Sequence, residues 1–247
     1  MSFLDYAEVI RFYNKYFLKL KETLMKAILK DNAPKAREYR GHFSIQTLNS
    51  NNEVLDSYED NNLIVNDARL IMARLLAGKK DSLGITEFCL GTRGHDEVNN
   101  DILTPKPIGQ DGYDEDREML FSEEQKTPFY YSVKWNPTNL RDGVNLPVSF
   151  DLDEVEFVAV GNKKDQIGQE QDAENAQIPM KITISGNAVT FEITIPETAA
   201  NGMNGQSVVA YTEAGLKCDG KLFSIKCFSS KNKEESVKFK ITWRIYF

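Results

Sequence analysis

The sequence predicts a mainly β protein: an antiparallel β-sandwich with an N-terminal α-helical arm and one short covering helix. Three observations favour this fold class. Short segments of alternating hydrophobicity recur from residue 40 onward, turn-forming residues separate them, and helical periodicity is confined to two places. The 247 residues suit a single large β domain. We therefore divide the chain into an arm, residues 1–33, and a β-sandwich domain, residues 36–247.

The arm is predicted from apolar residues that recur every three or four positions, which is the spacing of one helix face. These residues are Tyr6, Val9, Ile10, Tyr13, Phe17, Leu20, Leu24 and Ile28. Several lysines decorate the same helix, and Pro34 ends it because proline cannot continue a helix. Such a helix could lie on a membrane surface. Its apolar face is rich in Tyr, so we favour packing on its own domain or on a neighbouring subunit, with Tyr6, Ile10, Tyr13, Phe17 and Leu20 as candidate assembly residues.

The β domain opens with a predicted hairpin and the covering helix. Residues 42–48 alternate in the β manner, residues 49–52 form a turn cluster, and residues 54–58 return as the partner strand. A helix is predicted over 66–77, since Asn66 can cap its start and Gly78 can end it. Its apolar positions indicate that it covers a core.

Further strands are predicted through the rest of the domain, with turn signals between them. The expected strands are residues 84–92, 129–135, 148–152, 154–160, 180–185, 188–195, 207–212, 221–228 and 236–247. Gly186 and Asn187 form a two-residue turn that favours primed hairpin geometry.

Two long acidic loops interrupt these strands, at about 93–126 and 162–177. Asp111, Asp114, Glu115 and Asp116 in the first could suggest calcium. The alternation of an EF-hand is not present, however, so we interpret this stretch as a solvated acidic loop.

Composition narrows the class of protein. The formal net charge is −7, which argues against a nucleic-acid binder because phosphate contacts need clustered Lys and Arg. The three cysteines are odd in number and lack metal-ligand spacing, which indicates reduced thiols in a reducing cytoplasm. Cys218 and Cys227 could also face each other across a hairpin. The sequence contains no uncharged apolar run of the kind found in a signal peptide or a membrane-spanning helix.

No catalytic, cofactor or metal site is predicted. The two histidines, His42 and His95, lack neighbouring ligands in the sequence, and no phosphate-binding loop or nucleophile elbow occurs. The carboxylates Asp151, Asp153, Glu154 and Glu156 are interpreted as edge-strand charges. The aromatic group Phe129, Tyr130, Tyr131 and Trp135 could stack sugars, but core packing is the commoner role of such residues in a strand.

Two separated stretches carry a family resemblance. The first runs from Asn61-Asn62-Leu63-Ile64-Val65-Asn66 through Leu75-Leu76-Ala77-Gly78 to Leu90-Gly91-Thr92. The second comprises Glu213-Ala214-Gly215-Leu216, then Gly220-Lys221-Leu222-Phe223, and the ending Ile241-Thr242-Trp243-Arg244-Ile245-Tyr246-Phe247. Both stretches resemble segments of tail, neck and baseplate proteins of tailed bacteriophages.

The resemblance implies a virion structural protein, made in the cytoplasm of a bacterial host. Its signature residues, Glu213, Gly215, Leu216, Trp243 and Phe247, are then expected to determine the fold, not to catalyse a reaction. The implied partners are other virion proteins (tail, neck, portal or fibre components) in a symmetric homo-oligomer, with no nucleic acid and no membrane. The alternative is a receptor- or glycan-binding module, such as a head fibre or a capsid decoration protein.

Overall fold

The fold is described from a computed structural model. The chain divides into Met1–Glu38 and Tyr39–Phe247. The structure describes residues 40–77, 84–96, 104–126, 130–135, 154–164, 176–202 and 208–247, all in the second unit. The candidate arm residues Tyr6, Ile10, Tyr13, Phe17 and Leu20 therefore lie outside the described residues.

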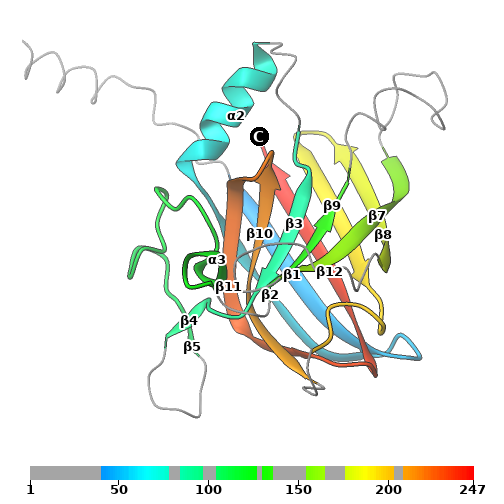
Figure 1. Ribbon diagram of the computed structural model, residues 1–247. Helices are drawn as coiled ribbons and strands as arrows, with labels where there is room; N and C mark the ends of the chain where they lie inside the picture. The colour runs from blue at the N-terminus through cyan, green and yellow to red at the C-terminus, as the bar shows by residue number, and fades with distance from the viewer. Residues whose placement is uncertain are drawn as a thin grey trace, which may run out of the picture. The chain divides into compact units, whose positions relative to one another are not determined.

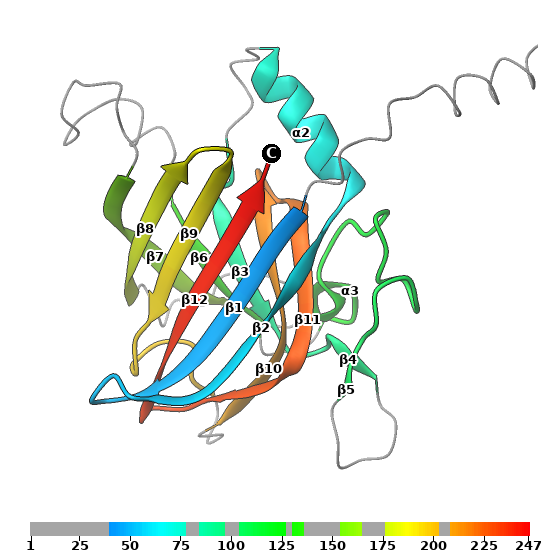
Figure 2. The ribbon, with the colours of Figure 1, turned by 180° about the vertical axis from the view of Figure 1, so that it is seen from behind.

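Ten antiparallel strands close into a single barrel (Figures 1 and 2). In order around the wall they are β1 (Arg40–Asn49), β12 (Val237–Tyr246), β9 (Ala188–Ile195), β8 (Ala176–Ser185), β7 (Glu154–Lys164), β6 (Tyr130–Lys134), β3 (Glu87–Gly91), β10 (Val209–Cys218), β11 (Lys221–Lys233) and β2 (Val54–Ile64). The mainly β prediction is confirmed, but the predicted sandwich is wrong. The reason is that β12 pairs with β1 on one side and β9 on the other, which joins what would have been two sheets.

Most of the predicted elements are found. The helix expected over 66–77 is α2 (Asn66–Leu76), and the described strands match the expected ones to within a few residues at most of their ends. The expected strand over 148–152 lies outside the described residues. The turn at Gly186 has φ +59°, and the turn between β10 and β11 uses Asp219 and Gly220 at φ +49° and +75°. Positive φ at these positions is what primed hairpin turns require.

The barrel interior is a packed apolar core, because alternate residues of each strand point inward. Strand β12 shows the pattern clearly, with Val237, Phe239, Ile241, Trp243 and Ile245 all buried. The Trp243 ring lies at the centre of an aromatic group, with its centroid 4.9 Å from Phe43 and 6.3 Å from Phe88.

Other segments close the core at its margins. Helix α2 lies across one end of the barrel (Figure 1) and contributes Ala68, Ile71 and Met72 to the core. Ala199 and Ala200, from the segment that follows β9, are buried in the same core, and the Tyr211 hydroxyl donates a hydrogen bond to the Ala200 carbonyl at 2.9 Å. The signature residue Trp243 is thus part of a core that is covered beyond the strands themselves.

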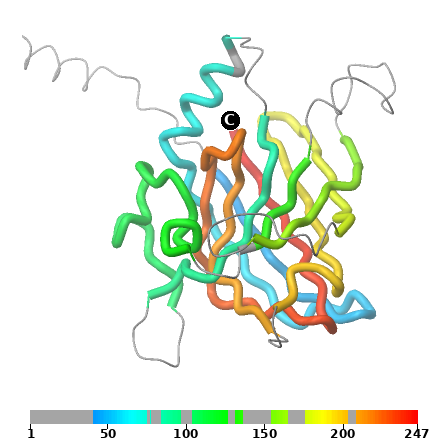
Figure 3. The backbone as a smooth tube through the Cα atoms, in the orientation of Figure 1, coloured from blue at the N-terminus to red at the C-terminus, as the bar shows by residue number. Residues whose placement is uncertain are grey.

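The chain between β3 and β6 leaves the wall and covers its outer face. This segment carries the short pair β4 (His95–Asp96) and β5 (Thr104–Pro105), and the single-turn helix α3 (Phe121–Glu124). It lies beside β11, outside the barrel (Figure 3). Asp111, Asp114, Glu115 and Asp116 are exposed, as expected of a solvated acidic loop. The stretch is not solvated throughout, because Tyr113, Leu120 and Phe121 are buried against the wall. The second acidic loop was expected over 162–177. Residues 162–164 belong to β7, residues 176 and 177 belong to β8, and residues 165–175 lie outside the described residues.

Replacing Trp243 with Ala should lower the free energy of unfolding by about 3–5 kcal/mol, because it leaves a large cavity in the packed core. Chemical denaturation monitored by far-ultraviolet circular dichroism measures this change. The control, Val158→Ala, removes an outward side chain that is 58% exposed, and its effect should stay within about 0.5 kcal/mol. Equal effects of the two substitutions would contradict the placement of Trp243 in the core.

Candidate functional site

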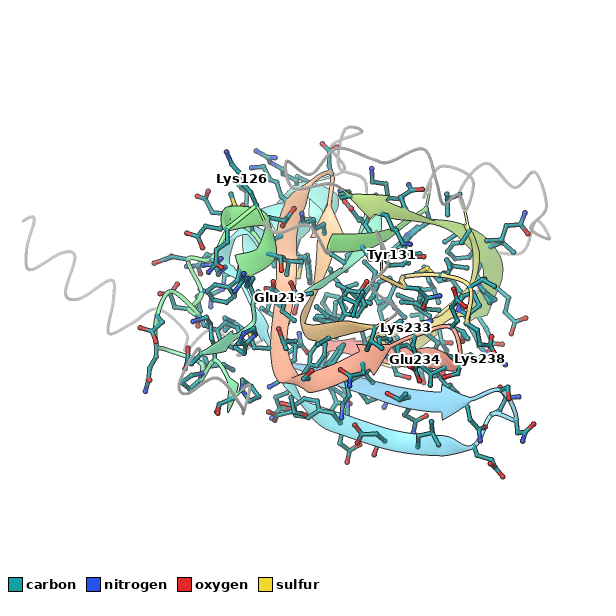
Figure 4. The ribbon with its side chains drawn as sticks, turned by 60° about the horizontal axis from the view of Figure 1, so that its bottom comes forward. Lys126, Tyr131, Glu213, Lys233, Glu234 and Lys238 are labelled. Atoms are coloured by element: carbon teal, nitrogen blue, oxygen red, sulfur yellow. The ribbon has the colours of Figure 1, made fainter. Side chains whose placement is uncertain are left out.

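The most distinctive site of the described chain is a fully buried carboxylate, Glu213 of β10. Its side chain points out of the barrel toward the start of α3 (Figure 4). It accepts hydrogen bonds from the backbone N–H of Phe121 at 2.8 Å, the backbone N–H of Ser122 at 2.7 Å, and the Ser122 hydroxyl at 2.5 Å. A residue from one end of the sequence thus fastens the covering segment to the wall.

Glycines make this approach possible. A Cβ atom at Gly91 would lie 2.5 Å from Ser122 Oγ, and one at Gly94 would lie 2.6 Å from the Thr212 carbonyl oxygen. A Cβ at Gly215 would lie 2.9 Å from a Leu120 methyl carbon. Side chains at these positions would push the covering segment away from β3 and β10.

Burial raises the pKa of Glu213, and the surrounding N–H and O–H donors limit that rise. The donors compensate for the loss of water around the carboxylate, as the desolvation of a charge requires. Phe121 is itself held by cations: the Arg117 guanidinium carbon lies 3.5 Å and Lys106 Nζ 5.1 Å from its ring centroid. Charge and apolar burial therefore act together to fix the segment.

The layer beneath α3 contains thiol and hydroxyl groups, and these groups are buried. Burial raises the pKa of the Cys89 and Cys227 thiols well above the ordinary value, which opposes thiolate formation. All three cysteines are buried, and none forms a disulfide bond. The Ser122 hydroxyl donates to Glu213, but Ser122 is 1% exposed and Glu213 is fully buried, so the pair is closed to a substrate. His95 Nδ1 lies 3.2 Å from Thr212 Oγ1. We interpret the cluster as a structural clamp.

A second buried charge group lies on the same outer face. Lys164 of β7 pairs with Glu87 of β3 at 3.1 Å, and Lys217 of β10 pairs with Glu123 of α3. Burial alone would raise the pKa of Glu87, but the ammonium groups of Lys164 and Lys217 outweigh it and lower that pKa below 4.5. These charges connect the wall to α3 across three strands.

A third polar group bridges strands β2 and β11, where the backbone pairing of the wall is short. The two strands pair only at Leu63 with Ile225 and Ile64 with Ser224. We call the remaining stretch, formed by Val54–Asn61 and Lys226–Lys233, the β2–β11 seam. Across it, side chains replace backbone pairing.

The seam is bridged by two ion pairs whose lysines are buried and whose carboxylates are exposed. Lys226 Nζ lies 2.6 Å from Asp60, and Lys231 Nζ lies 2.5 Å from Asp56. Tyr58 sits between them: it donates to Asp60 at 3.3 Å, and burial, with the nearby Asp60 charge, raises its pKa to about 12. The acidic groups of β2 thus face the surface of the molecule.

An open groove of about 500 Å³ crosses the outer face of β7, β8, β9 and β12. Its lining combines Val158 and Pro179 with the charged groups Glu156, Lys181 and Glu192. Lys181 already pairs with Glu154 at 2.5 Å. Glu154 is thus a surface ion-pair residue on a strand of the closed barrel and not the edge-strand charge expected from the sequence, whereas Asp151 and Asp153 lie outside the described residues.

The signature residues come to different places. Glu213 and Gly215 face outward under the covering segment, while Leu216 and Trp243 point into the core. Phe247 is 49% exposed, and its backbone N–H donates to the Asn187 carbonyl at 2.8 Å. It follows β12 on the surface and does not close the core.

The structure also places the candidate sugar-stacking aromatics and the acidic residues considered for calcium. Trp135 and Tyr131, offered as sugar-stacking residues, are buried in the barrel core, and the Trp135 ring centroid lies 6.1 Å from that of Phe191. Within the described ranges, no group of three or more His, Cys, Asp or Glu residues is placed to hold a metal ion. Asp114 and Asp116 instead organise the covering segment. The Asp114 carboxylate accepts a hydrogen bond from the Asp116 N–H, and the Asp116 carboxylate accepts one from the Asn66 side chain.

Sequence reasoning missed the clamp itself. Its signal was Tyr113 with Leu120-Phe121, a few apolar residues inside a polar stretch, and the pairing of Gly91 and Gly94 with a distant glutamate. Neither feature is visible in strand periodicity.

Comparisons with known proteins identify no relative of this chain. No family model, no curated protein and no solved structure matches the chain. Among the described residues, no helix has the length and hydrophobicity needed to cross a membrane.

Replacing Glu213 with Gln should destabilise the covering segment by about 1–3 kcal/mol, because the amide group would face N–H donors that need an acceptor. Hydrogen–deuterium exchange of the Phe121 and Ser122 amides should accelerate, while amides of β12 keep their protection. Glu118→Gln, an exposed change in the same segment, is the control. Unchanged exchange at Phe121 and Ser122 would show that Glu213 does not hold the segment.

Replacing Glu87 with Gln should remove a pH-dependent contribution to stability. Because the folded-state pKa of Glu87 lies below its ordinary value of 4.5, the unfolded chain takes up the proton first as the pH falls. The contribution is therefore complete above pH 4.5 and is lost below it. Denaturation at a series of pH values should show Glu87→Gln about 3 kcal/mol less stable at neutral pH, with the gap closing in acid. A constant gap would refute the proposed ion pairing, and Glu156→Gln, at an exposed site, should show almost no gap.

Proposed function

We propose that this chain is a non-enzymatic structural component of a tailed-phage virion. In this role it assembles with copies of itself and with other virion proteins in the tail, neck or baseplate region. It would be made in the cytoplasm of the bacterial host and would enter the particle as a folded barrel.

One observation carries the proposal: the two stretches that resemble tailed-phage proteins lie next to each other in the fold. The end of β2 pairs with β11 at Leu63 and Ile225, and β3 pairs with β10 from Glu87 to Gly91. Gly91 of the first stretch touches Glu213 of the second. Residues more than a hundred positions apart thus build one structural unit, as a shared architectural motif would.

The chemistry of this unit supports a structural role. Glu213 is used to hold the covering segment, and the glycines permit close packing, so the signature residues act on the fold. A net charge of −7 helps such a protein to remain soluble at high copy number. Exposed apolar side chains on β2, Val54 and Leu55, offer a surface for neighbours.

The glycan-binding alternative is less well supported. It would use Tyr130, Trp135 or the acidic loop, and the Trp135 side chain is only 8% exposed. Stacking on a sugar needs an accessible ring face, which a core residue does not offer.

The proposal is tested by locating the chain in intact particles. Cryo-electron microscopy of the virion should find the barrel at symmetry-related positions of the tail, neck or baseplate. Light scattering of the purified full-length chain should show an oligomer. A monomeric chain that is absent from purified particles would refute the proposal.

Deleting residues 1–33 separates assembly from folding. The shortened chain should keep the circular dichroism spectrum of a β protein yet fail to enter particles in a complementation experiment. Normal incorporation would show that the arm has no part in assembly. Loss of the β spectrum would show that the arm belongs to the core.

A further inference from the structure

Strand β2 has an edge that is largely without backbone pairing in the barrel wall. It pairs with β1 along most of its length, but with β11 only at Leu63 and Ile64. From Val54 to Asn61, its second edge has no backbone ladder partner in the part of the chain that the structure describes. An unpaired strand edge is a site where proteins accept or must block a neighbour, and covering by a helix is one natural solution.

The chemistry of this edge is acidic with an apolar end. Residues 53–60 contain four acidic residues and no basic one. Val54 and Leu55 are 55% and 58% exposed. The seam lysines, Lys226 and Lys231, are engaged by Asp60 and Asp56, whereas Glu59 makes no ion pair with any described residue.

The acidic charge of this edge disfavours a second β2 edge as its neighbour and favours a basic segment. A second copy of the same edge would bring four acidic residues against four, which disfavours edge-to-edge pairing of two β2 strands. The helix predicted over residues 6–28 has the opposite character, with five basic residues and two acidic ones. The apolar face expected for that helix needs a partner, and the exposed Val54 and Leu55 provide apolar contact.

We infer that the β2–β11 seam receives the predicted amphipathic helix, residues 6–28, of a neighbouring copy of this chain. The apolar face of the helix covers Val54 and Leu55, and its lysines approach Glu59. The inference rests on the proposed function, since it identifies the surface on which the assembly arm acts.

The positions of the two ends make this contact directional. The arm joins β1 at Arg40, whereas Leu55 lies next to the turn at the opposite end of that strand. Ten residues of strand span about 33 Å. Repeated head to tail, a contact between the arm of one copy and the far end of the next barrel gives a ring when the rotation closes, whereas reciprocal exchange of two arms gives a dimer.

A cross-linking experiment on the full-length chain tests the inference directly. A photo-reactive residue is placed at position 55, and unlabelled and isotopically heavy chains are mixed before assembly. Mass spectrometry should find cross-links from position 55 to residues 6–28 that join light and heavy chains. The same photo-reactive residue at position 158, where Val158 is equally exposed, should give no such cross-links.

Matched substitutions give an independent readout. Leu55→Asp and Glu59→Lys should each weaken self-association about tenfold or more in light scattering. Val158→Asp and Glu156→Lys make the same changes on β7 and should leave self-association unchanged. High salt should weaken the wild-type oligomer, because part of the attraction is electrostatic.

The outcomes separate this inference from the proposed function. Cross-links only within one chain, or to β2 of a second copy, would overturn the inference while an assembled oligomer still supported the function. An oligomer that is insensitive to both β2 substitutions would do the same. A chain that stays monomeric and gives no cross-links between copies would contradict both.

Discussion

The pairing of β12 with both β1 and β9 is the constraint on which the rest of the structure depends. It joins the first described strand to the meander of β6 to β9, and it places Trp243 between residues of both. Without it the wall would have two open edges, and the aromatic group around Phe43 would lose its cover. Because the β1–β12 pairing connects residues about two hundred positions apart, the core is complete only when β12 joins β1. Topologies rich in such non-local pairs fold slowly, since loop closure precedes the gain from contacts.

The individual strands were predictable because alternation is local. The pattern from Val237 to Tyr246 assigns each side chain to the core or the surface whatever the partner strand is. Closure was not predictable on the same basis, since a sandwich and a barrel require the same alternation and differ only in which edges pair. The hairpin β10–β11 illustrates this: its turn at Asp219-Gly220 is readable from sequence, whereas its insertion between β2 and β3 is not.

The contact of Glu213 with the covering segment could not be predicted from the sequence for a different reason. Composition treats a charged residue as a surface residue, and the segment around Tyr113 and Phe121 is mostly polar. In the fold, the carboxylate is buried because N–H donors at the start of α3 meet it, and those donors come from a segment about ninety positions earlier. The resemblance to phage proteins pointed to Glu213 and Gly215 as fold determinants. It could not show that they act by fastening a cover to the outside of a barrel.

Buried ionic groups of this kind tie the position of the covering segment to the wall more than they add net stability, because desolvation offsets much of their attraction. The seam follows a different principle: its lysines are buried while its carboxylates reach the surface, so β2 keeps a negative edge. The same charges that discourage two such edges from pairing leave a basic helix as a favourable cover. In the assembly that we propose, an acidic barrel with a basic arm separates folding from assembly. The core and the clamp determine the fold of the described barrel, and the attraction between opposite charges would then act between copies, where it would favour an ordered contact over edge-to-edge aggregation.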